Sequence, residues 1–491
     1  MKSIILIIFI IVSLNISCST FQESDIQKPN IIFLIADDAG YADFGCYGQE
    51  IFSTPNIDRM AAEGILFTQH YAGSTVCAPS RSVLMTGQHT GHTFIRGNSV
   101  TGAAGQQSRR PVNTVRKRVR PEGQFPIADS IMILPELLKR AGYITGGFGK
   151  WGLGWPGSEG DPVNQGFDTW FGYNCQGLAH NYYTEYLWHN RDTVFLHGND
   201  NGGTGQYSFD IIHQKALEFI EENKDQPFFL YLPYTIPHAE LLVPDDSLFQ
   251  KYLGKFEETP YVGVDDGPRY RKGPYGSQAN PRAAFAAMME RLDRSVGDIM
   301  KKIDDLGVGN NTIFIFTSDN GPHVEGGADP DFFDSNGIYK GYKRDLYEGG
   351  IRVPFIVRWP NVIKAGGKTG HISAFWDVLP TLCEIADVKV PENIDGISFL
   401  PVLEQTGNQM KHDYLYWEFY EQGGKQAVRM GNWKGIRLHV AENPDNPIEL
   451  YNLAEDPGES NNVAEQYPDI VREIKKYMSD AHTTSELFTY K

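Results

Sequence analysis

The chain has 491 residues, of which 41% are apolar and 21% charged, and its formal net charge at pH 7 is −17. This length is sufficient for a large core and a second, smaller one, and the lack of internal repeats argues against solenoids and propellers. The acidic balance excludes the overall basic footprint of a nucleic-acid-binding protein, so we expect no nucleic acid partner.

The first residues are typical of an export signal. Lys2 precedes an apolar run over residues 4–14, which is too short to span a bilayer comfortably. The run predicts a signal peptide over residues 1–20 and an exported protein, periplasmic or at the cell surface. Because Cys18 follows an imperfect lipobox at residues 14–17, a lipid anchor to the membrane through Cys18 and simple cleavage nearby both stay open.

The next segments predict an α/β fold. Short apolar runs are typical of strands buried on both faces of a parallel sheet; they occupy residues 30–36, 143–148, 227–233 and 312–317. Helical patterns lie between them, several ended by glycine; they occupy residues 54–64, 134–141, 211–222 and 283–306. We therefore expect a mixed, mostly parallel central sheet flanked by helices.

The pattern changes after about residue 374. A helical stretch at residues 378–386 precedes a linker that contains Pro and Gly, and a last helix is expected at residues 468–481. Between them lie short strand-like pieces at residues 414–419, 426–430, 433–438 and 448–452. We predict a large domain over residues 26–373 and a small C-terminal subdomain over residues 374–491, built from an antiparallel sheet and a packed helix.

Four of the predicted strands run directly into polar side chains with useful chemistry. These side chains are Asp37 and Asp38, Lys150, His238, and Asp319 and Asn320. Sites in open α/β sheets gather at the carboxyl ends of strands, so we expect these residues to converge. Capping of a strand or of the next helix would explain one or two of these cases, but less easily all four.

The acidic members of this set predict a metal site. Asp37, Asp38, Asp319 and Asn320 offer hard oxygen ligands, with neither thiolate nor imidazole among them. That chemistry suits Ca²⁺ or Mg²⁺ and not zinc.

Residues 77–87 carry the most informative motif, Cys-Ala-Pro-Ser-Arg-Ser-Val-Leu-Met-Thr-Gly. Pro79 near the start and Gly87 after the end fit a short helix with Cys77 at its N-terminal lip. Such a lip favours negative charge and suits a nucleophile that binds an anion. A buried structural cysteine is the alternative.

This segment resembles the signature of the sulfatase family, Cys-x-Pro-Ser-Arg followed by Leu/Met-Thr-Gly, in which the cysteine is oxidised to formylglycine after translation. Further stretches resemble other motifs of the family; they lie at residues 30–38, 149–154, 237–238, 317–321, 343–354 and 449–457. The resemblance covers most of the mature chain. It implies an alkaline-phosphatase-like fold, a formylglycine-generating maturation enzyme as partner, and calcium as the usual ion in preference to Mg²⁺.

The resemblance also implies residue roles. A hydrated formylglycine at residue 77, bound to Ca²⁺ with the four oxygen ligands, would attack sulfur, and its second hydroxyl would then expel sulfate. Arg81 would hold this group in its anionic form. Lys150 and Lys343 would bind the sulfate oxygens, and His238 would protonate the leaving alcohol.

Gly152 departs from the family's pattern. Many members carry His two residues after the first lysine, where it aids the elimination of sulfate. Another base must act in this chain, or water must. His323 is the first candidate and His180 the second, although either can instead be a substrate contact or a structural histidine.

The expected substrate is a sulfated carbohydrate or another sulfate ester. Arg96, His180 and His323 are candidate substrate contacts. A basic segment without acids would either attract an anionic substrate or form a solvated loop; its members are Arg109, Arg110, Arg116, Lys117, Arg118 and Arg120.

Two alternatives follow from the same fold. A phosphoesterase or phosphonate hydrolase would need more metal ligands, usually including several histidines, and the sequence has no second cluster. A non-catalytic, glycan-binding relic would have lost the nucleophile motif or the metal acids, and this chain retains both.

Overall fold

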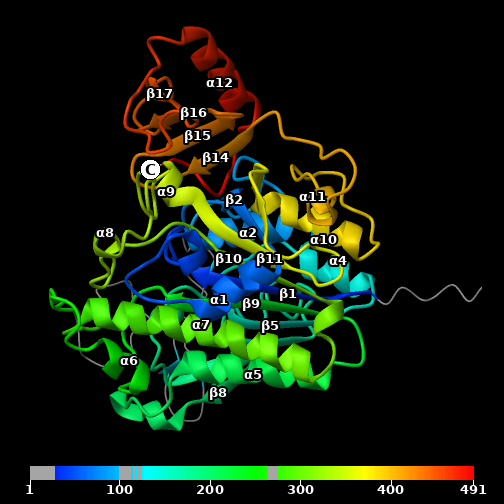
Figure 1. Ribbon diagram of the computed structural model, residues 1–491, viewed down its shortest axis with the longest axis vertical. Coiled ribbons are helices and arrows are strands. Elements are labelled where there is room, and N and C mark those ends of the chain that lie inside the picture. The colour runs from blue at the N-terminus through cyan, green and yellow to red at the C-terminus, as the bar shows by residue number, and fades with distance from the viewer. Residues whose placement is uncertain (1–27, 99–111, 114–117, 120–123, 264–274, 491) are drawn as a thin grey trace, which may run out of the picture.

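One large sheet organises most of the chain, with helices on both of its faces and a small second sheet at one end (Figure 1). The computed structural model describes residues 28–98, 112–113, 118–119, 124–263 and 275–490. The predicted signal peptide with Cys18 lies outside the described residues, as does most of the basic segment at residues 109–120. In the described part, no helix combines the length and apolar character needed to cross a membrane.

The large sheet contains 11 strands. Their bounds are β1 Asn30–Asp37, β2 Ile65–Tyr71, β5 Ile144–Lys150, β6 Thr169–Tyr173, β7 Tyr186–His189, β8 Asp192–Phe195, β9 Phe228–Pro237, β10 Thr312–Ser318, β11 Arg352–Arg358, β12 Gly367–Thr369 and β13 Ser373–Ala374. The order across the sheet is β12-β2-β11-β10-β1-β9-β5-β6-β7-β8, with β13 beside β2. A separate pair, β3 (Val112–Asn113) and β4 (Arg118–Val119), is antiparallel.

The centre of this sheet is parallel, as predicted. Asn30 of β1 pairs with Thr312 of β10, and Ile31 pairs with Phe229 of β9. Strand β5 runs parallel to both β9 and β6. The antiparallel strands β11 and β7 join the two edges of this parallel block, which makes the whole sheet mixed.

The helices form two layers around the sheet. Their bounds are α1 Pro55–Glu63, α2 Cys77–Thr86, α4 Leu134–Arg140, α5 Ser208–Glu222, α6 Ser247–Tyr252, α7 Pro281–Asp305, α8 Pro330–Phe333, α9 Glu348–Ile351, α10 Val378–Ile385, α11 Leu400–Glu404 and α12 Pro468–Asp480. Helices α1, α5 and α7 share one hydrophobic cluster, and α2, α4 and α10 share the other. Figure 1 shows α5 and α7 crossing the sheet on the face opposite α2 and α10.

Strand β1 shows why its sequence is a continuous apolar run. Ile31 and Phe33 belong to the cluster that contains α2, whereas Ile32 and Leu34 belong to the cluster that contains α7. Because successive strand residues point to opposite faces, a strand covered on both sides needs apolar residues at every position.

The C-terminal segment forms the small antiparallel sheet that the sequence predicts. Its strands pair in the order β14 (Leu415–Phe419), β15 (Lys425–Met430), β16 (Trp433–Leu438) and β17 (Ile448–Asn452). Helix α12 packs on this sheet through Ile474 and Met478. Strand β13 and helix α10 still pack on the large sheet and its helices, so the division at residue 374 stays a prediction.

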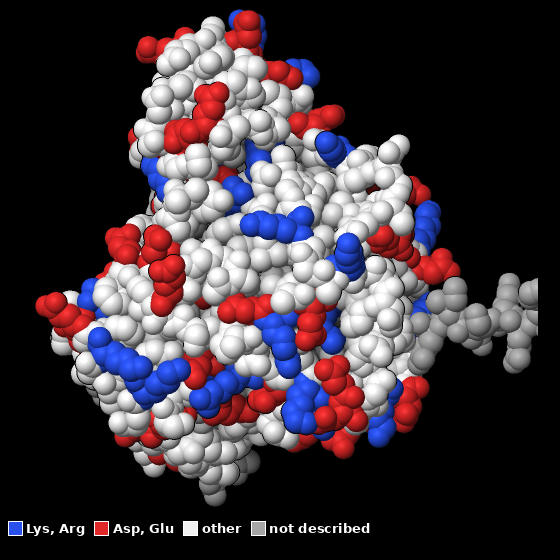
Figure 2. Space-filling view, viewed as in Figure 1, with Lys and Arg blue, Asp and Glu red and all other residues white. Residues whose placement is uncertain are grey.

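Several strands of the large sheet have no counterpart among the predicted elements: β2, β6, β7, β8, β11, β12 and β13. Strand β2 places Thr68 and Gln69 among its apolar residues, and β11 carries Pro354 and a terminal arginine. Polar side chains and proline weaken the periodic signal, and only the neighbouring strands stabilise these segments in extended form. Figure 2 shows acidic and basic side chains interspersed over the face that carries α7, without a field of one sign.

Candidate active site

The predicted polar residues meet at one edge of the large sheet. Strands β10, β1, β9 and β5 are consecutive parallel neighbours, so their carboxyl ends lie side by side. These ends carry Asp319 and Asn320, Asp37 and Asp38, His238, and Lys150. The structure therefore brings together the four segments that the sequence only suggested would converge.

Cys77 is the first residue of α2 and lies against the end of β1. Its Sγ is 3.2 Å from Asp37 Oδ1 and 3.9 Å from Asp38 Oδ1. Burial and the neighbouring Asp37 raise the pKa of the Cys77 thiol well above its usual range. An unmodified thiol at this position therefore stays protonated, because the helix N-terminus does not offset the desolvation and the carboxylates.

Two adjacent aspartates face the same sulfur because the chain turns sharply after β1. Asp38 has a left-handed backbone with φ of 65°, so its side chain does not point to the face opposite Asp37, as it would in a regular strand. The Asp38 amide donates to Asp319 Oδ1 at 3.2 Å, and Asn320 Nδ2 donates to Asp38 Oδ1 at 2.7 Å. Asn320 Oδ1 is buried and has no hydrogen-bond partner among the described residues.

Each carboxylate of this cluster faces at least one buried cation, and Asp37 faces both Lys150 and Arg81. Arg81 Nη2 donates to Asp319 Oδ2 at 2.9 Å, and Lys343 Nζ donates to Asp38 Oδ2 at 2.7 Å. The Lys150 ammonium forms an ion pair with Asp37. In addition, the Arg81 guanidinium donates to the carbonyl of Lys150, which ties α2 to the end of β5.

The carboxylates differ in proton affinity because their surroundings differ. Burial alone would raise the pKa of Asp37, but Lys150, Arg81 and Lys343 lower it to about 2. Burial, reinforced by the charge of Asp37, raises the pKa of Asp319 to about 7. Asp37 therefore stays ionised, whereas Asp319 binds a proton more readily than an ordinary aspartate.

His238 is held between Lys343 and the backbone. Its Nδ1 faces the carbonyl of Ala239, and its Nε2 lies 3.0 Å from Lys343 Nζ and 3.3 Å from Asp38 Oδ2. Burial and the Lys343 charge lower the pKa of His238 well below its usual range. The imidazole is therefore neutral, with the proton on Nδ1 and the Nε2 lone pair accepting from the Lys343 ammonium.

The two candidate bases flank His238 as a stack of rings. The His180 ring centroid lies 4.8 Å from that of His238, and the His323 centroid lies 5.6 Å from it on nearly parallel planes. His323 Nε2 is 3.1 Å from the carbonyl of Pro237, and its Nδ1 accepts from the amide of Glu325 at 3.2 Å. Both His323 nitrogens are thus engaged by backbone groups, whereas in the part of the chain that the structure describes His180 Nδ1 is buried without a partner.

Arg96 is not part of this group. Its Nη1 donates to Tyr420 Oη at 3.0 Å and to the carbonyl of Thr483 at 2.6 Å, and its Nε donates to the carbonyl of Thr93 at 2.9 Å. The Arg96 guanidinium therefore joins the loop after α2 to the C-terminal segment, and the substrate contact predicted for it stays a prediction.

The sequence analysis missed Glu325. Its Oε2 accepts from Lys343 Nζ at 3.1 Å, and its Oε1 binds the Arg344 guanidinium. Although burial opposes it, Lys343 and His238 hold the pKa of Glu325 well below its usual range. Position alone could not identify it, because a glutamate two residues after a histidine in a loop is common.

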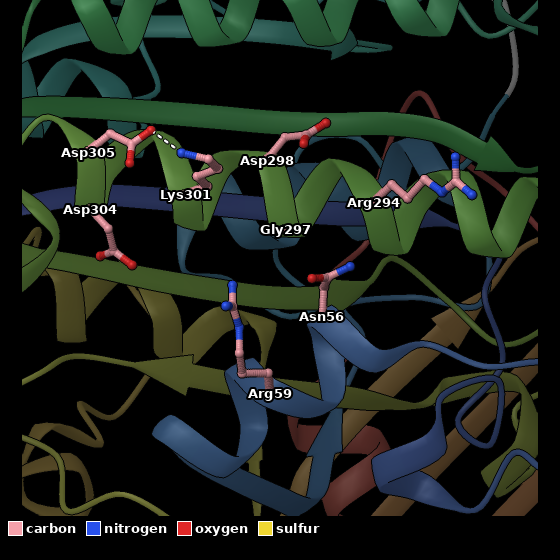
Figure 3. Close-up of a pocket in the computed structure, with 8 residues that line it drawn as sticks. All are labelled: Asn56, Arg59, Arg294, Gly297, Asp298, Lys301, Asp304 and Asp305. Carbon is pink, nitrogen blue, oxygen red and sulfur yellow. Dashed lines mark hydrogen bonds and ion pairs between the residues drawn. The ribbon is translucent and has the colours of Figure 1, made fainter.

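A different hollow lies between α1 and α7 (Figure 3). It is lined by Asn56, Arg59, Arg294, Gly297, Asp298, Lys301, Asp304 and Asp305. Its charges are of both signs, and Lys301 forms an ion pair with Asp305 along the same helix. Because none of the residues described above lines this hollow, the chemistry belongs at the edge of the sheet.

Comparison with known proteins agrees with this geometry. A sequence model of the sulfatase family matches residues 29–388, and one described as the C-terminal part of N-sulphoglucosamine sulphohydrolase matches residues 337–484. The human N-acetylgalactosamine-6-sulfatase is 31% identical over 88% of this chain and 81% of its own length. The N-acetylgalactosamine-6-O-sulfatase of Bacteroides thetaiotaomicron is 29% identical over 93% of this chain and 94% of its own length.

A solved structure extends the agreement to three dimensions. Ps i-CgsB, crystallised with k-i-k-neocarrahexaose, is 26% identical and superposes with a TM-score of 0.75 over 95% of this chain and 96% of its own. The family model covers more than two thirds of the sequence, including every segment that meets at the sheet edge. The chain therefore belongs to the sulfatase family and is a sulfuric ester hydrolase.

Proposed function

We propose that this enzyme hydrolyses sulfate esters of carbohydrates, using a formylglycine made from Cys77 and a bound calcium ion. The observation that carries the proposal is the position of Cys77. It begins α2 with its Sγ 3.2 Å from Asp37 Oδ1, inside a ring of buried cations formed by Arg81, Lys150 and Lys343. A buried cationic ring suits a dianionic or monoanionic oxyanion such as sulfate.

The carboxylate cluster fits a calcium ion. Asn320 Oδ1 is a buried acceptor without a donor, and the ligand atoms of Asp37, Asp38 and Cys77 lie within 4.8 Å of one another. Asp319 completes an all-oxygen donor set of the kind that Ca²⁺ prefers. These four residues, with an oxygen at residue 77, would hold the ion, which would lower the pKa of an oxygen bound to it.

The side chains around residue 77 would bind and orient the sulfate ester. Formylglycine would supply the nucleophilic oxygen that the neutral, buried thiol of Cys77 lacks. Lys150 and Lys343 would donate to the sulfate oxygens and stabilise the charge that develops there, and Arg81 would hold residue 77 in its anionic form. Before substrate binds, ion pairs with Asp37, Asp38 and Asp319 keep these three cations oriented.

The leaving alcohol would receive its proton from the pair formed by Lys343 and His238. The imidazole is neutral, its Nδ1 faces a carbonyl, and its Nε2 accepts from Lys343 Nζ at 3.0 Å. His238 would give the leaving alcohol its proton, and the Lys343 ammonium beside it would stabilise the charge that develops on the alcohol oxygen.

Relatives support a carbohydrate sulfate as substrate. Two of them are named for N-acetylgalactosamine-6-sulfate chemistry, and Ps i-CgsB was crystallised with a neocarrahexaose. The predicted export signal would place the enzyme outside the cytoplasm, in contact with such glycans, and a lipid anchor through Cys18 would hold it at the membrane surface.

The test compares the chain expressed with and without a formylglycine-generating enzyme. We expect an aldehyde at residue 77, detected by mass spectrometry of a hydrazine adduct, and turnover of 4-methylumbelliferyl sulfate only where the aldehyde is present. Cys383→Ala is the matched control, because Cys383 is also a free buried cysteine, located in α10. Equal turnover with and without the aldehyde would overturn the proposal, and faster hydrolysis of 4-methylumbelliferyl phosphate would favour the phosphoesterase alternative.

A further inference from the structure

Gly152 leaves a place for a side chain, and another residue fills it. Gly152 has φ of +83°, and a Cβ built on it would lie 2.2 Å from the Nε2 atom of Gln176. The next nearest atoms, at 3.3 and 3.9 Å, also belong to the Gln176 side chain. The carboxamide of Gln176 therefore occupies the direction that a side chain at residue 152 would take, two residues after Lys150.

The Gln176 amide has hydrogen-bonding capacity that the protein does not use. Gln176 is only 8% exposed, and its Nε2 has no partner among the described residues. Asn174, in the same segment after β6, is fully buried, and neither atom of its side-chain amide has a partner in the described ranges. Buried amides that the fold leaves unpaired cost stability, so their persistence points to a ligand that pairs with them.

The same segment is tied to the start of α2. The backbone N–H of Gln176 donates to Gln124 Oε1 at 3.2 Å, and Gln124 Nε2 donates to the backbone carbonyl of Asn98 at 2.7 Å. Asn98 Oδ1 in turn accepts from the amide of Ala78 at 3.0 Å, directly after Cys77. Gln176 is thus positioned from two sides, by the end of β5 through Gly152 and by the first turn of α2.

We propose that the Gln176 carboxamide binds the sulfate group of the substrate, from the direction that a side chain at residue 152 would take. The inference rests on the proposed function. An amide N–H is a neutral donor and suits a sulfate oxygen, but an amide does not accept a proton at neutral pH. Gln176 therefore binds and orients sulfate without acting as the base for its elimination.

The experiment measures sulfate binding and turnover in Gln176→Ala and Gln176→Glu, using the mature enzyme with its aldehyde quantified. Losing one hydrogen bond to a charged oxygen raises KM for 4-methylumbelliferyl sulfate and the inhibition constant of inorganic sulfate by about tenfold each. Gln176→Glu, which keeps the shape but adds a negative charge, raises both further. Thermal melting within a few degrees of the parent shows that the variants remain folded.

Gln165→Ala is the matched control. Gln165 is 1% exposed and also carries an unpaired amide atom, but it precedes β6 and so lies at the opposite end of that strand. Its substitution leaves the sulfate inhibition constant unchanged. An unchanged inhibition constant in both Gln176 variants, in a preparation whose parent hydrolyses the ester, overturns this inference alone, whereas a parent without turnover overturns the proposed function.

A paired substitution tests the shared place directly. Gly152→His alone forces its side chain against Gln176, so we expect a loss of kcat/KM. The double variant Gly152→His with Gln176→Ala removes the obstruction and regains part of kcat/KM. Because φ of +83° strains any side chain at residue 152, Gly152→Ala with Gln176→Ala measures that strain alone. If this variant is active while the single and double His variants have equal kcat/KM, the two side chains do not compete for one position.

Discussion

Two clusters of buried charge in this molecule look alike and behave differently. One is the site at the sheet edge; the other, here called the joint cluster, consists of Tyr71, Glu348, Arg352, Arg429, Lys434 and Glu459 and connects the two sheets. In the joint cluster, Glu348 accepts from Tyr71 Oη at 2.7 Å, Arg352 Nη1 at 3.0 Å and Lys434 Nζ at 2.9 Å. Both oxygens of Glu348 are thus paired within the protein.

The site differs because its carboxylates converge on one point. Asp37 and Asp38 both face the sulfur of Cys77, and the Asp38 amide donates to Asp319 Oδ1. Carboxylates that converge in this way repel one another until a cation binds between them, whereas the cations around Glu348 hold two parts of the fold together. The comparison predicts that substitutions at the sheet edge lower activity more than stability. Substitutions in the joint cluster should lower stability more than activity.

The largest effect is expected at Cys77. Cys77→Ala should lower kcat for a sulfate ester on the order of 10⁶-fold, as the removal of other enzyme nucleophiles does. The melting temperature should stay near that of the parent, because alanine suits the helix N-terminus and removes a thiol crowded by two carboxylates. Steady-state kinetics and a thermal melt check this, and substantial residual turnover would show that another group attacks sulfur.

Removal of the metal should lower both activity and stability. Chelation should stop turnover and lower the free energy of unfolding by about 3 kcal/mol, the amount by which a ligand at roughly one hundred times its Kd stabilises the folded state. The reason is that Asp37, Asp38 and Asp319 then repel one another. Calcium should restore both properties better than magnesium. Full activity of protein shown to be metal-free by elemental analysis is the contrary outcome.

Substitution in the joint cluster should give the opposite pattern. Glu348→Gln leaves Arg352 without its carboxylate and Lys434 with Glu459 alone, so the free energy of unfolding should fall by about 3 kcal/mol. The kcat/KM of the protein that remains folded should change by less than about threefold. Urea denaturation with a parallel assay separates the two quantities, and a kcat/KM loss larger than the stability loss would mean that the clusters are coupled.

The smallest effect is a dependence of stability on pH. Burial raises the pKa of Glu459 to about 7, from an ordinary value of 4.5. Since the folded state binds this proton more tightly than the unfolded state, stability falls as pH rises from about 4.5 through about 7. Glu459→Gln should flatten the slope in that window. Glu348, whose pKa is lowered to about 2, changes stability only at pH values below that window. An unchanged slope in Glu459→Gln would therefore exclude Glu459 as its cause.

Local signals in the sequence predict the elements whose own residues specify a helix or a strand. The apolar run of β1 and the pattern ended by Gly307 after α7 were recognised nearly to the residue, because burial on both faces and glycine at a helix end leave clear traces. Strands β2 and β11 were missed, because their extended form depends on neighbours far away in the chain. The sequence also could not show that the Arg96 guanidinium binds Tyr420 and Thr483, which lie far along the chain, and the substrate contact of Arg96 stays a prediction.

The amino-acid order alone was enough to indicate the α/β class, the motif at Cys77 and the oxygen ligands, because each depends on residues close together in sequence. Only the folded chain decided that Asp38 turns back beside Asp37, that Asn320 Oδ1 stays unpaired, and that Gln176 fills the place beside Gly152. These features depend on packing between segments that are distant in sequence, since burial and the geometry of hydrogen bonds exist only once the strands lie side by side.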